Sequence, residues 1–174
     1  WQTGLGWLPE TGAPVNIVQR RQEADVDLHY FEHRAGTEMP RLIDPGEPVA
    51  SLAAMTSALL AGEIVCVMGD RIFGDRLQTT VSFLGDEIQL PGSPFYLAAR
   101  VGAPMAVVLT RRVGRSRVAG QIVRVIRAAD RPEHYGKTGS LTTTATIFAE
   151  CLEDYVKQYP YQFFNFYDLW SKDD

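Results

Sequence analysis

Short, continuous apolar runs recur along the chain and constrain its fold more than any other feature. They lie in residues 14–21 (PVNIVQRR), 63–71 (EIVCVMGDR) and 104–112 (PMAVVLTRR). Strands that are covered on both faces have this pattern, because neither face needs polar side chains at alternate positions. We therefore expect three strands here, the last two of them buried, and a shorter strand at residues 39–44 (MPRLID).

Helical stretches separate these strands. Apolar residues recur with a helical period in residues 23–35, 48–61 and 141–157, and a shorter helix is expected from residue 93 to Gly102. The apolar face expected for the second helix consists of Val49, Leu52, Ala53, Leu59 and Leu60. Strands that alternate with helices predict an α/β fold, with a mixed, mostly parallel sheet flanked by helices.

Two antiparallel pairs are expected to interrupt this order. Residues 81–90 (VSFLGDEIQL) alternate on both sides of a turn at Gly85 and Asp86, which predicts an inserted β-hairpin. Residues 117–127 are expected to pair with residues 104–112 as a long, partly exposed strand.

The composition, with 45% hydrophobic and 22% charged residues, fits a single globular domain over residues 1–174. Cys66 and Cys151 lie in apolar surroundings and indicate a reduced compartment rather than a disulfide framework. The sequence has no run of about 18 apolar residues, so it predicts no membrane-spanning helix. Because the sequence starts on Trp1 without a methionine, we expect it to be the C-terminal part of a longer protein.

Charged residues end two of the apolar runs. Arg20 and Arg21 end the first run, and Asp70 and Arg71 end the second, directly after Gly69. Ligands of open α/β sheets bind beyond the carboxyl ends of the strands. A carboxylate there can accept a hydrogen bond from a substrate hydroxyl, and arginines can bind phosphate through two hydrogen bonds. The alternative is that the strands end at the surface, where charged side chains stay hydrated.

A helix start is expected at Gly92, Ser93 and Pro94. Free backbone N–H groups and the positive end of the helix dipole make such a site receptive to an anion. An ordinary helix start explains the same residues, with Ser93 as the N-cap and Pro94 as the first helical residue. The sequence leaves both interpretations open.

Half of the arginines lie in residues 111–131, although the chain has a net charge of −4. They form either a solvated strand face or a surface for anionic lipid headgroups or an acidic protein. Aromatic residues do not alternate with these arginines, so we do not expect nucleic acid as a partner.

The C-terminal tail, residues 159–170 (YPYQFFNFYDLW), is rich in aromatic residues. We expect this segment to pack over the sheet, as large aromatic side chains usually do. A wall for an acyl chain, or a belt at a membrane interface, is the alternative.

Other chemistries find little support. His29 and His33 are one turn apart on an expected helix, but no partner with convincing spacing completes a zinc site. His33 and Glu38 have the spacing of a catalytic pair, but a helix end at Gly36 would separate them. The sequence lacks the G-x-S-x-G segment that would indicate a serine hydrolase. We therefore expect no metal and no cofactor.

Three segments, in this order, resemble the bacterial lipid A biosynthesis acyltransferase family of the lysophospholipid acyltransferase superfamily. They are VNIVQRR, GEIVCVMGDR and VSFLGDEIQLPGSPFYLAARVGAPMAVV, and the likeness covers nearly the whole chain. The resemblance implies a catalytic histidine in a His-x4-Asp/Glu motif ahead of the first segment.

The first two residues resemble the last two positions of that motif, which reads H-x-G-x-W-E/Q in the branch of the family whose C-terminal ending LEDYVKQYPYQFFNFYDLW resembles. The histidine is therefore expected just upstream of Trp1, and residues 1–174 are expected to be inactive alone. Gln2 would orient the histidine ring, but a neutral amide stabilises the ring's cation less than an acid does.

The resemblance assigns three further blocks to the site: Arg20 or Arg21, Asp70 with Arg71, and the turn of Gly92, Ser93 and Pro94. The implied reaction moves a fatty acyl group from an acyl carrier protein or acyl-coenzyme A to a hydroxyl of a lipid A-like glycolipid or a phospholipid. The histidine acts as general base, and the block residues hold the oxyanion or a phosphate.

By the same resemblance, the expected location is the cytoplasmic face of the bacterial inner membrane, at the membrane surface. An acidic carrier protein would suit the arginines of residues 111–131. One alternative is a non-catalytic family fragment that binds an anionic lipid or a partner protein. A weaker alternative is a metal-dependent phosphohydrolase with Asp70 as the nucleophile.

Overall fold

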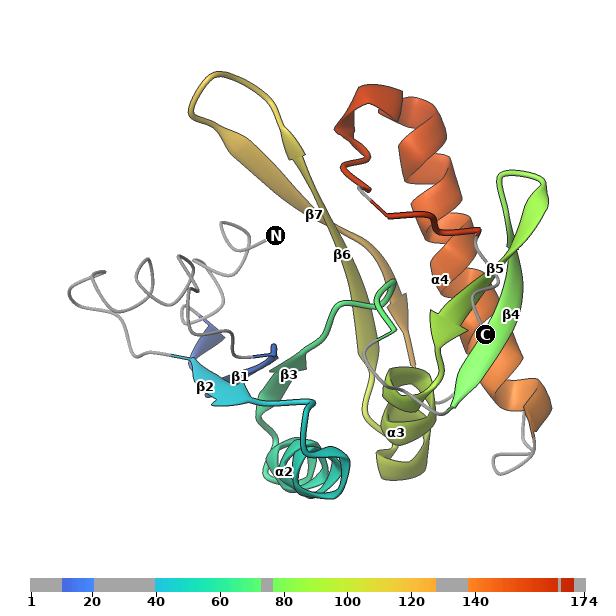
Figure 1. The fold of residues 1–174 in the computed structure, drawn as a ribbon. Coiled ribbons are helices and arrows are strands. Elements are labelled where there is room, and N and C mark those ends of the chain that lie inside the picture. Colours follow the sequence, from blue (N-terminus) through green and yellow to red (C-terminus); the bar gives the residue numbers. More distant parts are fainter. Residues whose placement is uncertain (1–10, 21–39, 73–76, 128–137, 166, 171–174) are drawn as a thin grey trace. The chain divides into compact units, whose positions relative to one another are not determined.

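The computed structural model describes residues 11–20, 40–72, 77–127, 138–165 and 167–170 (Figure 1). Contacts within the chain form two compact units, Trp1–Met68 and Gly69–Asp174. The α/β fold class is confirmed, with helices, a parallel sheet and an inserted hairpin. The helix expected over residues 23–35 lies outside the described residues, and the expectation of a single domain stays a prediction.

The first unit contains a three-stranded parallel sheet. Strand β1 (Val15–Val18) lies between β2 (Arg41–Ile43) and β3 (Ile64–Cys66). As the middle strand, β1 is the most deeply buried of the three, with Val15, Asn16 and Ile17 all buried. The expectation that residues 63–71 form a strand buried on both faces is wrong: only Ile64–Cys66 pairs, at an edge of the described sheet, and its side chains are half-buried.

Helix α2 (Pro48–Leu60) has the predicted extent, but its predicted apolar face is wrong. Val49 is 85% exposed and Leu60 71% exposed, whereas Ser51 and Ala58 are buried. The sequence of this helix, PVASLAAMTSALL, contains no charged residue, so apolar periodicity alone cannot select one face. Small side chains let the helix backbone approach the strands closely, which explains why Ser51 and Ala58 face inward.

The second unit is built around the predicted β-hairpin. Strands β4 (Gln78–Phe83) and β5 (Asp86–Pro91) alternate between buried and exposed side chains, and their buried face packs against helix α4 (Thr138–Gln158). The core consists of Val81, Phe83, Ile88, Leu90, Phe95, Ala145, Ala149, Leu152 and Leu169. Period-two alternation therefore placed this hairpin correctly.

The hairpin turn lies at Leu84 and Gly85, one residue earlier than predicted. Both residues have positive φ angles, 53° and 90°, and Phe83 pairs with Asp86. A left-handed conformation is unfavourable for leucine. The Leu84 N–H donates a 2.7 Å hydrogen bond to Oε2 of Glu153 on α4, and this long-range contact stabilises the turn.

The second predicted pair, β6 (Met105–Arg112) and β7 (Val118–Ile126), forms a separate antiparallel hairpin (Figure 1). Helix α3 (Ser93–Val101) precedes it and ends at Gly102 with a φ of 76°, as predicted. The expected burial of the strand over residues 104–112 is wrong, because Val107 is its only fully buried residue and Val108 is exposed.

The aromatic tail packs on the β4–β5 hairpin and α4. After the short helix η3 (Pro160–Gln162), the rings of Phe163 and Trp170 lie 5.9 and 6.0 Å from the ring of Phe83. Tyr161 stays 92% exposed. Packing over a sheet is therefore confirmed for some of the aromatic residues, and the β4–β5 hairpin is that sheet.

Candidate functional site

Asp70 and Arg71 lie on a turn after β3, together with Gly69; we call these three residues the Asp-Arg turn. A Cβ atom on Gly69 would come within 2.7 Å of the Phe148 ring of α4. Glycine therefore lets this turn lie directly against the helix. Asp70 is half-buried and Arg71 is exposed, so both side chains can reach a ligand.

Tyr167 of the tail contacts both charged residues of the Asp-Arg turn. Its hydroxyl donates a 3.0 Å hydrogen bond to the Asp70 carbonyl oxygen and lies 3.5 Å from Oδ2 of the Asp70 carboxylate. The Arg71 guanidinium carbon lies 5.3 Å from the centre of the ring, in cation–π range.

Partial burial, followed by the negative charge of Asp70, raises the pKa of Tyr167 to about 12. The hydroxyl therefore stays protonated at neutral pH and keeps its role as a hydrogen-bond donor. Sequence reasoning missed Tyr167, because the tail gave an aromatic signal but no indication that it would meet Asp70.

The turn at Gly92, Ser93 and Pro94 opens α3 in the same unit as the Asp-Arg turn. Gly92 is the N-cap, so the expectation of Ser93 as the cap is wrong; Ser93 is the first helical residue. The Gly92 N–H donates a 2.5 Å hydrogen bond to the Leu77 carbonyl, and a Cβ at residue 92 would lie 2.7 Å from that oxygen. Because the Gly92 N–H is bonded to Leu77 and Pro94 has no N–H, this turn has few backbone donors for an anion.

The remaining predicted residues belong to the first unit. Arg20 follows β1 and is exposed, as expected for a charged residue beyond a strand end. Arg21 and Gln2 lie outside the described residues, as do His29, His33 and Glu38.

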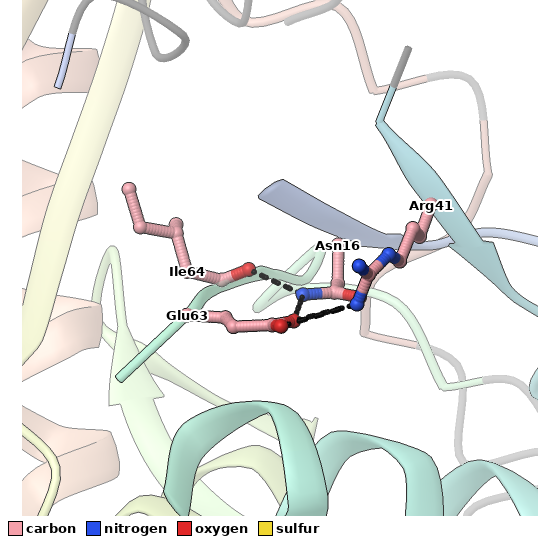
Figure 2. Close-up of polar contacts among 4 residues, drawn as sticks. All are labelled: Asn16, Arg41, Glu63 and Ile64. Atoms are coloured by element: carbon pink, nitrogen blue, oxygen red, sulfur yellow. Dashed lines mark hydrogen bonds and ion pairs between the residues drawn. The ribbon is translucent and has the colours of Figure 1, made fainter. Parts of the chain in front are cut away.

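A polar network that sequence reasoning missed joins the three parallel strands (Figure 2). The buried Asn16 amide donates hydrogen bonds of 2.8 Å to Oε2 of Glu63 and 3.2 Å to the Ile64 carbonyl. Arg41 donates to both oxygens of the same carboxylate, at 3.1 and 3.3 Å. The network lies at the amino ends of the strands, opposite the edge where ligands bind, so it ties the sheet together. In the sequence, the signal for this network was Asn16, a polar residue inside the apolar run VNIV.

Neither cysteine is suited to nucleophilic catalysis. Burial raises the pKa of the Cys66 thiol to about 11 and also raises the pKa of Cys151. The reactive form of cysteine is the thiolate, and these thiols remain protonated at neutral pH. In the described part of the chain, His, Cys, Asp and Glu form no group of three that could hold a metal ion.

The second unit therefore offers a carboxylate and a guanidinium on the Asp-Arg turn, with the neutral phenol of Tyr167 in contact with both. Such a set can accept a hydrogen bond from a hydroxyl and bind a phosphate.

Of the helices that the structure describes, none combines the length and apolar character that crossing a membrane requires.

Comparison with known proteins gives one clear result. A family model described as bacterial lipid A biosynthesis acyltransferase matches residues 1–172. A search among curated proteins found no match. The family match covers all the candidate site residues of both units.

Proposed function

The chain belongs to the bacterial lipid A biosynthesis acyltransferase family, and from this premise we propose that it moves a fatty acyl group from a thioester to a hydroxyl of a glycolipid. Membership establishes an acyltransferase that uses an acyl donor and a lipid acceptor. The proposed donor is an acyl carrier protein or acyl-coenzyme A, and the proposed location is the cytoplasmic face of the bacterial inner membrane. The observation that carries the proposal is the Asp-Arg turn, where a carboxylate and a guanidinium lie together on a restrained backbone.

In the proposed reaction, the acceptor hydroxyl oxygen attacks the thioester carbonyl carbon. The C–S bond breaks, and the thiol leaves with a proton that comes from the hydroxyl. The general base is the histidine of the family motif, which we expect ahead of Trp1 and oriented by Gln2. Asp70 accepts a hydrogen bond from a second hydroxyl of the acceptor and so orients the attacking hydroxyl toward the histidine, while Arg71 binds an acceptor phosphate.

The other predicted residues have supporting roles in this proposal. Arg20 or Arg21 contacts the polar part of the acceptor, because arginine suits phosphate recognition. The turn of Gly92, Ser93 and Pro94 completes the wall of the site, and its glycine is required by the close approach to Leu77.

An assay of thiol release by the full-length protein tests this function. With a long-chain acyl-coenzyme A or acyl carrier protein thioester, free thiol should appear faster when a phosphorylated glycolipid acceptor is added. A protein that binds anionic lipid vesicles but releases no thiol would instead fit the second candidate, a non-catalytic lipid-binding member. Release of inorganic phosphate that depends on a metal ion would contradict both.

We further propose that an acidic carrier protein docks on the β6–β7 hairpin. The sequence contains no Asp or Glu between Glu87 and Asp130, so every charged residue of the hairpin is an arginine. The paired residues Val108 and Ile122 are exposed on it. Apolar residues bordered by one sign of charge are typical of a surface for a protein of opposite charge.

Charge reversal at the tip of this hairpin should weaken the use of carrier-linked donors. The double variant Arg115→Glu/Arg117→Glu should raise the KM for an acyl carrier protein thioester by about tenfold and leave kcat unchanged, because exposed charges mainly affect encounter. The KM for acyl-coenzyme A should change much less, since no protein has to dock. Arg100→Glu on α3 is the matched control and should behave like the wild type. Equal KM values in all three proteins would overturn this docking surface.

A further inference from the structure

Tyr167 restrains the Asp-Arg turn from a distant part of the sequence. It lies 97 positions after Asp70, and its ring and hydroxyl contact the two charged residues separately. The hydroxyl bonds the Asp70 backbone, and the ring face attracts the Arg71 guanidinium. One side chain therefore limits the freedom of both.

The segment around Tyr167 is itself firmly held. Leu169 is buried in the core of the second unit, and the Trp170 ring stacks on Phe83. On the other side of Tyr167 in the chain, the Phe163 ring also packs against Phe83. Core packing therefore fixes the tail both before and after Tyr167 in the chain, and this fixes the position of the Tyr167 ring.

The Asp-Arg turn is also held by α4. The backbone at Gly69 lies so close to the Phe148 ring that no other residue fits without a shift. The turn thus has a fixed contact with α4 at Gly69 and with the tail at Asp70 and Arg71. Of the two Asp70 carboxylate oxygens, Oδ2 lies 3.5 Å from the Tyr167 hydroxyl, and the described residues donate no hydrogen bond to Oδ1.

We infer that Tyr167 is a positioning residue that presets the Asp70 carboxylate and the Arg71 guanidinium for the lipid acceptor. The inference rests on the proposed function, because it needs Asp70 and Arg71 to bind the acceptor. A site whose groups are already oriented loses less conformational freedom when the substrate binds. The hydroxyl and the ring make separate contributions, so two substitutions can separate them.

Steady-state kinetics of the full-length protein tests the inference with Tyr167→Phe and Tyr167→Leu. Tyr167→Phe keeps the ring below Arg71 and loses the hydrogen bond, so kcat should fall about fivefold with little change in the acceptor KM. Tyr167→Leu also loses the ring, so the acceptor KM should rise by a further factor of about three. Tyr161→Phe, the same change on a tail tyrosine that is 92% exposed, is the matched control and should leave both constants unchanged.

The outcomes distinguish this inference from the proposed function. If Tyr167→Phe and Tyr167→Leu keep wild-type kcat and KM while Asp70→Asn is impaired, the inference is wrong and the function stands. If the wild type shows no acceptor-dependent transfer, the proposed function fails. Loss of activity in both variants with a matching fall in unfolding temperature, and without a separation of kcat from KM, would reduce Tyr167 to a structural role and overturn the inference.

Discussion

Asp70→Asn should lower kcat for acyl transfer by about 100-fold, the effect typical of removing one oriented polar group from a reacting centre. Asparagine has nearly the same shape, but it lacks the charge that strengthens the hydrogen bond from the second hydroxyl of the acceptor. The Tyr167 hydroxyl bonds the backbone carbonyl of Asp70, so this restraint survives the substitution. The unfolding temperature should therefore stay close to that of the wild type.

A matched substitution separates a local effect from a general loss of negative charge. Asp154 is exposed on α4, and Asp154→Asn makes the same chemical change away from the Asp-Arg turn. Its kcat should equal that of the wild type. If Asp70→Asn and Asp154→Asn have equal kcat values, Asp70 does not belong to the site.

Phe83→Ala should destabilise the second unit by about 3–5 kcal/mol, the usual cost of truncating a buried phenylalanine. The side chain is 0% exposed, and the rings of Phe163 and Trp170 pack against it. Removing its ring leaves a cavity between β4, α4 and the tail. Chemical denaturation followed by fluorescence measures the change in the free energy of unfolding.

The control for this prediction is Phe164→Ala in the tail. Phe164 is 62% exposed, so the same truncation should cost no more than about 1 kcal/mol. If Phe83→Ala and Phe164→Ala change the free energy of unfolding equally, the described core is wrong.

Local patterns predicted some elements well because the signal was itself local. The alternation in residues 81–90 determines which side chains of the hairpin are buried, and the structure confirms it. The turn was placed one residue too late, because Leu84 adopts a left-handed conformation held by Glu153, which is 69 positions away. In α2 the sequence has no charged residue to mark the outer face, so the buried side could not be predicted.

In the candidate site, too, local sequence patterns were informative, whereas contacts between distant residues could not be predicted. Charged residues beyond apolar runs indicated Asp70 and Arg71 from the sequence alone. Tyr167 could not be predicted as their partner, because its position depends on how Leu169 and Trp170 pack in the core. The N-cap at Gly92 was also missed, since it depends on a backbone contact with Leu77.

Mass spectrometry of the lipid acceptor gives the most direct measurement. The full-length protein, supplied with an acyl thioester and a phosphorylated glycolipid, should increase the mass of the acceptor by one fatty acid minus one water. Asp70→Asn should give far less product in the same time, and Asp154→Asn the same amount as the wild type. An acceptor of unchanged mass with both carrier-protein and coenzyme A thioesters would contradict the acyl transfer proposed for this chain.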